Sequence, residues 1–383
     1  MYLWFGKEYI NMKKILFSAV SLDVGGIETA LVTLLNHLAN EKENEEYKYE
    51  ITLFLEKKEG IFLNEIDERI QIKEYVPSKL KLALIRKLIN FIKQTMLRIK
   101  YKEKFDFSCA YATYSKPASF VARNGSKNSC LWIHLDYLEF FNNNKNEVIK
   151  FFEGIKLKEF QHIVCVSEKC RESFLKVFPY EESKTIHINN LINYKKIIKM
   201  SNEKIDNKFE NKNIVTFINI GRQEEGQKRL SRLIKACDLL QKDDATKGKF
   251  RLVLIGDGID SEKYKEMIKT YGLEKNIEML GKKKNPYPYL KMSDCLVLCS
   301  SYEGYPVVYV ESMVLNKPII TTYVSGTKEV QDENYDVMVV QHNEQDLFVA
   351  MKNFIKGNEE KKSTEFDPEK YNKDIMKKLE KMI

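Results

Sequence analysis

The sequence predicts an α/β protein with two doubly wound domains, each a parallel β-sheet covered by helices on both faces. Its 383 residues exceed what one hydrophobic core usually holds. Short apolar runs alternate with helix-like patterns through both halves of the chain, which is typical of parallel sheets. A polar segment without apolar periodicity, residues 201–213, separates the halves. We therefore expect an N-terminal domain over residues 1–200, a linker over 201–213 and a C-terminal domain over 214–366.

The composition is typical of a globular cytoplasmic protein. Hydrophobic residues make up 43% of the chain and charged residues 31%, which is enough apolar material for two cores and argues against global disorder. No apolar run reaches the roughly 18 to 20 residues that span a bilayer. The seven cysteines contain no Cys-x-x-Cys pair, so we expect reduced core residues. The first eleven residues lack the features of a signal peptide, and Met12 is an alternative start to Met1.

The first half predicts a regular alternation of elements, with apolar runs indicating strands and a 3.6-residue period indicating helices. The expected strands are residues 15–20, 51–55, 105–111, 129–134 and 162–166, and the expected helices are residues 27–38, 79–104 and 167–177. This series predicts one doubly wound sheet.

The second half predicts a second sheet of the same kind. The expected strands are residues 214–220, 251–255, 277–280, 295–299 and 318–322, and the expected helices are residues 228–240, 262–271 and 306–315. A charged helix over residues 367–383 begins with Pro368, which suits a first helical turn. We expect this helix to pack back on the N-terminal domain.

The helix expected at residues 79–104 is basic and amphipathic, with apolar residues at helical spacing and Lys and Arg between them. Two interpretations are open: its apolar stripe faces its own domain, or it docks on a membrane surface. The net charge of +8 comes with no recognised nucleic-acid motif. We expect no nucleic-acid partner.

The chemistry is expected in the loops that follow the strands, because ligands of open parallel sheets bind at the carboxyl ends of the strands. The strongest candidate loop is SSYEGYPVVYVE, residues 300–311. Gly304 permits an unusual turn, and Pro306 suits the first turn of a helix. The free N–H groups of Val307 and Val308 would then face an anion such as a diphosphate.

Two glutamates in this loop are candidates for binding hydroxyl groups. Glu303 lies in the loop and Glu311 about a turn and a half into the helix. One carboxylate could bind a sugar while the other accepts hydrogen bonds from ribose. The alternative is that both are ordinary solvated glutamates.

Further candidates follow two other strands of the second half. In the loop that begins at Gly221, Arg222 and Lys228 offer positive charge for phosphates. Gly281 and Lys282 follow the strand at 277–280, where backbone could contact a nucleotide base.

The N-terminal half offers a glycine pair and a histidine. Gly25 and Gly26, with Glu28, follow the first strand and let the backbone approach a ligand closely. They lack the G-x-G-x-x-G spacing of a dinucleotide site, which argues against a dehydrogenase. His134 ends a strand, where it can donate to a hydroxyl or phosphate or be a structural histidine.

Several reaction classes have no motif in the sequence. We find no D-x-D, H-E-x-x-H, P-loop or G-x-S-x-G pattern. We therefore expect no metal, no ATP hydrolysis and no serine-hydrolase chemistry.

Taken together, these motifs resemble family 4 of the glycosyltransferases, which has the GT-B fold of two Rossmann-like domains facing a central cleft. The Glu-x7-Glu signature runs from Glu303 to Glu311, and GGIE, WIH, VSE, NNLIN, GRQEEGQKR, IGDG and NKPIITT extend the resemblance over most of the chain. Only the first eleven residues and the basic region fall outside it. The family often has glycine directly after the lysine that corresponds to Lys228, whereas this chain has Arg229.

The resemblance implies a retaining transfer of a sugar from a nucleotide-diphosphate sugar, expected to be a UDP-sugar, without a metal or other cofactor. Arg222 and Lys228 would hold the diphosphate, Glu311 the ribose and Glu303 the transferred sugar, and His134 would contact the sugar or acceptor. The expected catalytic residues are Glu303, Arg222, Lys228 and His134, and the expected donor contacts are Glu311, Gly304, Tyr305, Pro306, Val307, Val308, Gly281, Lys282 and Gly221.

The turn at Gly25 and Gly26 would admit donor and acceptor. The expected acceptor is a glycan or lipid-linked sugar of a bacterial cell-surface polysaccharide, such as capsule or lipopolysaccharide, and the expected location is the cytoplasm or the inner face of the plasma membrane. Two alternatives remain: a non-hydrolysing sugar-nucleotide epimerase, for which a Glu-x7-Glu loop is unexpected, and a non-catalytic partner subunit in a membrane-associated glycosylation complex.

Overall fold

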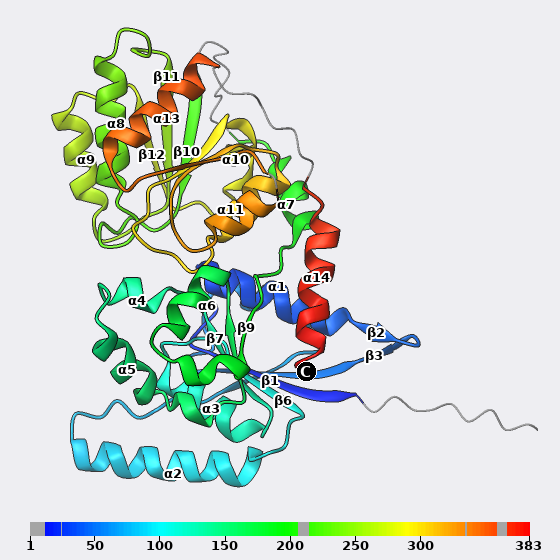
Figure 1. Cartoon of the computed structure of the whole chain (residues 1–383). Coiled ribbons are helices and arrows are strands. Elements are labelled where there is room, and N and C mark those ends of the chain that lie inside the picture. The colour runs from blue at the N-terminus through cyan, green and yellow to red at the C-terminus, as the bar shows by residue number, and fades with distance from the viewer. Residues whose placement is uncertain (1–11, 24, 206–213, 334, 358–365) are drawn as a thin grey trace, which may run out of the picture. The chain divides into compact units, whose positions relative to one another are not determined.

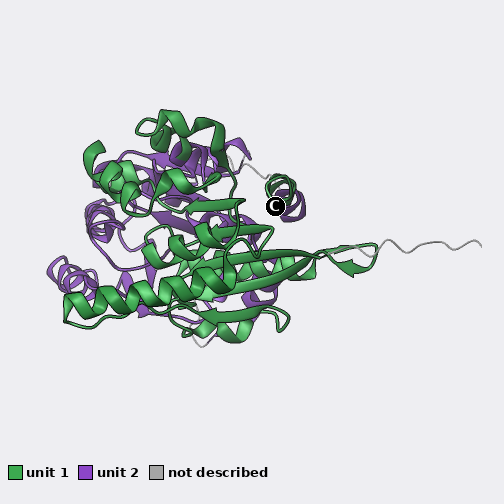
Figure 2. Ribbon diagram, turned by 90° about the horizontal axis from the view of Figure 1, so that it is seen from below, with its two compact units in different colours: residues 1–166, 171–191, 374–383 green, residues 167–170, 192–373 purple. Residues whose placement is uncertain are grey.

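The computed structural model describes residues 12–23, 25–205, 214–333, 335–357 and 366–383 (Figure 1). The chain forms two compact units (Figure 2). Unit 1 comprises Met1–Val166, Arg171–Leu191 and Asp374–Ile383, and unit 2 comprises Ser167–Cys170 and Ile192–Lys373. Of the two alternative starts, Met1 lies outside the described residues and Met12 lies within them. Most of the expected linker, residues 206–213, also lies outside them.

Unit 1 contains a parallel sheet of seven strands in the order β5-β4-β1-β6-β7-β8-β9. Its strands are β1 (Lys13–Ala19), β4 (Tyr49–Leu55), β5 (Gln71–Glu74), β6 (Phe107–Ala110), β7 (Ser129–Ile133), β8 (His162–Cys165) and β9 (Thr185–His187), and a short hairpin is formed by β2 (Lys42–Glu43) and β3 (Glu46–Tyr47). The central strands are apolar on both sides because helices cover both faces of the sheet.

The helices of unit 1 are α1 (Gly26–Asn40), α2 (Ala83–Tyr101), α3 (Lys116–Gly125), α4 (Tyr137–Phe140), α5 (Lys145–Gly154) and most of α6 (Glu168–Leu175), with 3₁₀ turns at Ile61–Glu65, Leu157–Glu159 and Pro179–Lys184. Three of these helices, α3, α4 and α5, start at side-chain caps. The Ser115 hydroxyl accepts a hydrogen bond from the N–H of Ala118 at 2.9 Å, and Asp136 and Asn144 cap α4 and α5 in the same way. The basic segment expected at residues 79–104 is helical only over the bounds of α2.

Unit 2 contains a parallel sheet of six strands in the order β12-β11-β10-β13-β14-β15. Its strands are β10 (Val215–Ile220), β11 (Phe250–Ile255), β12 (Ile277–Gly281), β13 (Cys295–Leu298), β14 (Ile319–Thr322) and β15 (Val337–Val340). Its helices are α7 (Tyr194–Ser201), α8 (Leu230–Lys242), α9 (Ser261–Thr270), α10 (Tyr287–Met292), α11 (Val307–Val314), α12 (Thr327–Asp332) and α13 (Glu344–Lys356). The two parallel sheets confirm the predicted α/β fold class.

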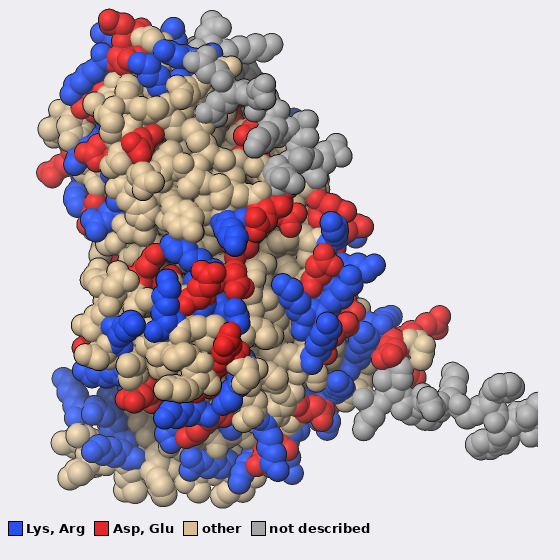
Figure 3. Space-filling model, in the orientation of Figure 1, with Lys and Arg blue, Asp and Glu red and all other residues tan. Residues whose placement is uncertain are grey.

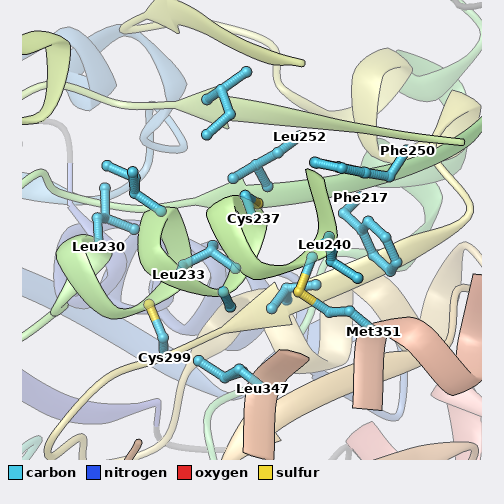
Figure 4. Packing of buried hydrophobic residues seen from close by; sticks show 14 of the residues in the cluster. Phe217, Leu230, Leu233, Cys237, Leu240, Phe250, Leu252, Cys299, Leu347 and Met351 are labelled. Carbon is cyan, nitrogen blue, oxygen red and sulfur yellow. The ribbon is translucent and has the colours of Figure 1, made fainter. Parts of the chain in front are cut away.

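Alternate side chains of the unit 2 strands enter two separate cores. Phe217 and Leu252 pack with α8, α9 and α13, as Figure 4 shows for part of this cluster. Ile218 and Val253 point to the opposite face and pack with residues of α10 and α11. This period of two along each strand is what a sheet covered on both faces requires.

The order of strands in unit 2 creates a topological switch point. The chain runs from β10 to β11 and β12 on one side and then returns to place β13 on the other side of β10. The loops that follow β10 and β13 therefore start at the carboxyl ends of two neighbouring strands and lead in opposite directions. Open α/β sheets bind ligands between such loops. Unit 1 has the same arrangement around β1, which lies between β4 and β6.

The last helix, α14 (Pro368–Glu380), begins at Pro368. Residues from Asp374 onward belong to unit 1. There the Lys13 ammonium donates to the Ile383 carbonyl at 3.2 Å, and the Asn128 amide donates to the Met382 carbonyl at 2.9 Å. These bonds attach the C-terminal residues to unit 1 near the amino ends of β1 and β7.

All seven cysteines are buried thiols, and none of them forms a disulfide bond in the described part of the chain. Among the described helices, none is long and apolar enough to cross a bilayer.

Candidate active site

The loop after β10 lies close to the loop after β11. The would-be Cβ of Gly256 would fall 1.8 Å from the Gly221 carbonyl oxygen, and Gly256 has a φ of +134°. Only glycine fits such a position, because a side chain would both clash and be strained. The Lys228 side chain passes over Gly221, where an added Cβ would lie 3.6 Å from Lys228 Cε. This is an ordinary van der Waals distance, so the Lys228 side chain lies directly over Gly221 without excluding a small side chain there.

Lys228 forms an ion pair with Glu303 across the switch point. Its Nζ lies 2.6 Å from Glu303 Oε1. The side chains of Lys228 and Glu303 are only 19% and 9% exposed. The structure therefore brings together one residue from each of the two predicted loops, as a shielded pair of opposite charges.

Gln227 links this pair to Arg222. Its amide Nε2 donates to Glu303 Oε2 at 3.2 Å and to the Tyr302 carbonyl at 3.3 Å. Its Oε1 accepts a hydrogen bond from Arg222 Nη2 at 3.2 Å. Gln227 is buried, whereas the Arg222 side chain is 65% exposed and also lies 3.4 Å from Glu224. A buried amide thus orients the carboxylate of Glu303 and holds one edge of an accessible guanidinium.

Arg229 adopts a backbone conformation that favours glycine. Its φ is +52° and its ψ is 41°, in the left-handed region, directly before α8. Its side chain donates to the Ser301 hydroxyl at 3.1 Å and lies 3.8 Å from Glu225. This conformation gives a physical reason for glycine at the corresponding position of similar loops.

The loop after β13 leads into α11, but two details differ from the expectation. Pro306 is the residue before the helix rather than part of its first turn, with extended backbone angles. Gly304 is not among the described residues with positive φ; the glycine with this property beside the loop is Gly326, at +93°. An added Cβ on Gly326 would lie 2.7 Å from the Tyr305 ring, so Gly326 is what allows close packing there.

The start of α11 supplies backbone donors. The helix begins at Val307, so the N–H groups of Val307 and Val308 have no partner inside the helix. Such N–H groups carry partial positive charge and favour anions. The Tyr305 side chain is buried, so its ring is shielded from a ligand.

Glu311 is buried inside the first turns of α11, with 9% of the residue exposed. Its Oε1 accepts a hydrogen bond from the Tyr287 hydroxyl at 3.0 Å. Burial raises the pKa of Glu311 from 4.5 to about 7, and the bond from Tyr287 offsets part of that rise. Glu303 is buried as well, at 7%. The interpretation of both glutamates as ordinary solvated residues is therefore wrong.

Gly281 and Lys282 lie at the carboxyl end of β12. Gly281 has a φ of +65°, and its carbonyl accepts a hydrogen bond from the N–H of Gly256 at 3.0 Å. Lys282 is exposed. Both residues thus lie on the same edge of the sheet as the Lys228–Glu303 pair.

In unit 1, Gly25 precedes α1 and Gly26 is its first residue. The backbone of Gly25 is extended, so it needs no left-handed conformation. A Cβ added to Gly25 would lie 2.1 Å from Glu28 Oε2. The Glu28 carboxylate therefore folds back over the start of the helix, and a larger residue at position 25 would have to displace it.

His134 follows β7 and packs against aromatic rings. Its ring centroid lies 4.5 Å from that of Tyr111, and its ring stacks on Trp132 at 6.4 Å. Burial lowers the pKa of His134 to about 3, so the ring is neutral at pH 7. Within the described residues, its Nε2 is shielded and has no hydrogen-bond partner. A neutral ring with one unused nitrogen can exchange a hydrogen bond with a hydroxyl but supplies no positive charge.

Gln227, Tyr287 and Gly326 also lie at the site and were not predicted from the sequence. The only signal for Gln227 was its place beside Lys228 in a loop rich in charged residues. Tyr287 and Gly326 gave no signal, because they are brought to the site by folding. Among the described residues, no group of three or more His, Cys, Asp and Glu side chains gathers as metal ligands do.

Comparison with known proteins identifies sequence relatives. A family model described as glycosyl transferases group 1 matches residues 200–373. An uncharacterised glycosyltransferase of Methanocaldococcus jannaschii is 34% identical over 154 residues, which is 39% of this chain and 36% of that protein. The N-acetylgalactosamine-N,N'-diacetylbacillosaminyl-diphospho-undecaprenol 4-alpha-N-acetylgalactosaminyltransferase of Campylobacter jejuni is 26% identical over 367 residues, covering 92% of this chain and 93% of its own.

Solved structures share the fold at low sequence identity. HepE of Anabaena, in complex with UDP and glucose, superposes with a TM-score of 0.71 at 18% identity, over 96% of this chain and 99% of its own. WaaG, a glycosyltransferase involved in lipopolysaccharide biosynthesis, gives a TM-score of 0.65 at 13% identity, over 89% and 90%. These likenesses show the GT-B fold. The family match includes both loops of the Lys228–Glu303 pair, so residues 200–373 belong to the group 1 glycosyl transferases, family 4 of the glycosyltransferases, and the chain is an enzyme of the glycosyltransferase class.

Proposed function

We propose that this enzyme transfers a sugar from a UDP-sugar to a lipid-linked glycan, with retention of anomeric configuration, in the synthesis of a bacterial cell-surface polysaccharide. The observation that carries the proposal is the network of Arg222, Gln227, Lys228 and Glu303 at the switch point of the unit 2 sheet. It combines accessible positive charge with a fixed carboxylate.

The donor diphosphate would bind where positive charge converges. Arg222 offers a planar guanidinium, Lys228 an ammonium, and Val307 and Val308 offer backbone N–H groups. Cleavage of the sugar–phosphate bond builds negative charge on the leaving diphosphate. Fixed donors stabilise this charge more in the transition state than in the ground state, which accelerates the reaction.

The two buried glutamates would bind hydroxyl groups of the donor. Glu311 would accept hydrogen bonds from the ribose, and Glu303 from the transferred sugar. Gln227 already holds one oxygen of Glu303, so the carboxylate presents its remaining lone pairs in a fixed direction. Such preorganisation reduces the entropy that binding must remove.

The transfer exchanges one bond at the sugar C1 for another. The bond from the sugar C1 to the diphosphate breaks, and a bond from C1 to the acceptor hydroxyl oxygen forms on the same face. The acceptor proton passes to the leaving phosphate oxygen, so no covalent intermediate with the protein is needed. In unit 1, the contact of His134 with a sugar or acceptor hydroxyl, made through its neutral ring, stays a prediction.

The relatives support the classes of donor and acceptor. HepE has been solved in complex with UDP-glucose, which favours UDP as the nucleotide. The Campylobacter jejuni relative carries diphospho-undecaprenol in its name, which favours a polyprenyl-diphosphate-linked acceptor. The lipopolysaccharide 1,6-galactosyltransferase of Escherichia coli, 31% identical over 121 residues, favours cell-surface glycans in general.

A donor panel tests the proposal. UDP- and GDP-sugars are incubated with the full chain, with and without EDTA, and with a polyprenyl-diphosphate-linked glycan. Nucleotide release is measured, and the anomeric configuration of the product is read by NMR. Glu303→Ala and Arg222→Ala are compared with Glu262→Ala, an exposed glutamate of α9.

One UDP-sugar should be turned over with retention, and only the first two variants should lose activity. Interconversion of sugar nucleotides without an acceptor would instead indicate an epimerase. An absence of turnover and of binding for every donor would indicate a non-catalytic subunit.

A further inference from the structure

Helix α2 of unit 1 concentrates the positive charge of the protein. Residues 79–102 contain eight Lys and Arg residues and no Asp or Glu. The net charge of the whole chain is +8, so the rest of the sequence is balanced. With 19 residues, α2 is about 28 Å long at 1.5 Å per residue.

One face of α2 is fixed to unit 1. Leu97 is buried there in a cluster with Phe120 and Val121. The Asn90 side chain accepts a hydrogen bond from the N–H of Ser78 at 2.6 Å. Arg98 donates to the Asn124 side chain at 3.1 Å. These contacts hold one face of the helix on its own domain. They do not involve the opposite face.

The opposite face is apolar and exposed. Leu84 is 83% exposed, Phe91 64% and Ile99 79%. The exposed large apolar side chains of the helix are Leu84, Ile85, Leu88, Phe91, Ile92, Met96 and Ile99. At 3.6 residues per turn they occupy a continuous arc of roughly 140°. The interpretation in which the apolar stripe packs on its own domain accounts for Leu97 but not for this arc.

Positive charge borders the apolar arc on both sides. By the same helical spacing, Lys93 and Lys100 lie along one border and Lys87 along the other, next to Arg98, whose side chain is bound to Asn124. Lys79 and Lys81 precede the helix. Within the part of the chain that the structure describes, the Lys and Arg residues of 79–100 form no ion pair with a carboxylate. Figure 3 shows blue and tan atoms together along the lower edge, where Figure 1 places α2.

We propose that residues 79–102 form a docking surface for a bilayer that contains anionic phospholipids. The apolar arc would enter the boundary between headgroups and acyl chains, and the bordering Lys and Arg side chains would meet lipid phosphates, because this is how amphipathic basic helices bind membranes. A second copy of the chain is a poor occupant, since two such surfaces carry eight positive charges each. This inference goes beyond the proposed transfer reaction and does not need a donor to be tested.

Vesicle flotation with the full chain tests the docking surface. Vesicles of phosphatidylcholine with 30 mol% phosphatidylglycerol, a composition chosen for the test, are compared with pure phosphatidylcholine, without nucleotide sugar. Binding is expected only to the anionic vesicles. It should weaken as salt rises, because surface charges are screened.

Two variants separate charge from apolar contact. In the first, Lys81, Lys87 and Lys100 become Gln; in the second, Leu84, Leu88 and Phe91 become Ser. The matched control replaces Lys247, Lys263 and Lys275 by Gln, which removes the same charge from exposed positions of unit 2. Each test variant should raise the lipid concentration for half-binding on the order of tenfold or more, while the control binds like wild type.

The proposal is overturned if the chain ignores anionic vesicles, binds both vesicle types equally, or if the α2 variants bind as the control does. Light scattering without lipid supplies a further test. If wild type is a dimer and the serine variant is a monomer, the apolar arc serves self-association instead. Thermal unfolding and UDP binding check that each variant is folded. Failure of vesicle binding with intact donor turnover would leave the proposed transfer reaction standing.

Discussion

The Lys228 ammonium lies 2.6 Å from Glu303 Oε1, although the two residues are 75 positions apart in the chain. Each comes from a different loop at the switch point of the unit 2 sheet. Because both side chains are largely shielded, removal of one leaves the other as an uncompensated buried charge.

Replacement of either partner should therefore impair both stability and activity. Lys228→Ala and Glu303→Ala are each expected to lower the free energy of unfolding by about 1 to 3 kcal/mol and turnover by about a hundredfold or more. Urea denaturation and donor turnover measure the two effects. The double variant should lose less stability than the two singles together. Full additivity, or a loss of the same size in Lys242→Ala on the surface of α8, would contradict a specific pair.

Gln227 should act as a positioning residue. Its amide joins Arg222 to Glu303, so Gln227→Ala is expected to reduce kcat by about tenfold through misplacement of both groups. KM for the donor should change less, since the charges that bind the diphosphate remain. Gln241→Ala, near the C-terminal end of α8, is the control. An unchanged kcat would show that the bridge does not orient the site.

Glu311 should make the unliganded protein less stable at high pH. Its folded pKa of about 7 lies above the ordinary 4.5, so folding favours the protonated form. Its contribution to stability is full below about pH 4.5 and is lost as pH rises through 7, a change of about 3 kcal/mol at 1.4 kcal/mol per unit. Glu311→Gln should match wild type at pH 4.5 and be more stable at pH 8 in urea denaturation.

The same substitution should weaken donor binding. A carboxylate accepts the ribose hydroxyls better than an amide does, so the affinity of wild type for UDP should rise as pH increases from 6 to 8. Glu311→Gln should bind UDP more weakly at pH 8 and show a flat pH profile. A wild-type affinity that does not change over this range would separate Glu311 from ribose binding.

Arg229 should tolerate glycine better than a branched residue. Its left-handed conformation, with φ of +52°, costs about 1 to 2 kcal/mol for residues other than glycine. Arg229→Gly is expected to stay within about 1 kcal/mol of wild type, because relief of strain offsets the lost contacts with Ser301 and Glu225. Arg229→Val should be less stable than Arg229→Gly by about 1 to 2 kcal/mol in urea. Equal stability of the two variants would show that the conformation is not maintained.

The alternation of strands and helices was predictable wherever strands are buried on both faces. The run in β13, Cys295–Leu298, is fully apolar and stands out in the sequence. The edge strand β5, Gln71–Glu74, contains mostly polar residues because one side faces solvent, and it was not predicted. The strand β9 has only three residues. Edge strands that bury little apolar surface, such as β5, are weakly encoded. The edge strand β12 was nevertheless predicted, and the apolar edge strand β15, Val337–Val340, was not.

The candidate site was predictable in its loops but not in its contacts. Lys228 and Glu303 were predicted because each lies in a loop that follows a strand. The structure pairs these two residues. The bridging role of Gln227 and the bond from Tyr287 to Glu311 depend on segments that are distant in sequence. The raised pKa of Glu311 likewise follows from burial, which no local pattern reports.

The central claim is that the unit 2 loops bind a nucleotide diphosphate, and calorimetric titration of UDP and UMP tests it most directly. UDP should bind wild type on the order of tenfold or more tightly than UMP, because Arg222 and Lys228 meet the second phosphate. In Arg222→Ala and Lys228→Ala this difference should largely vanish, while Lys242→Ala keeps it. Equal affinity of wild type for UDP and UMP, or no binding of either, would contradict the account.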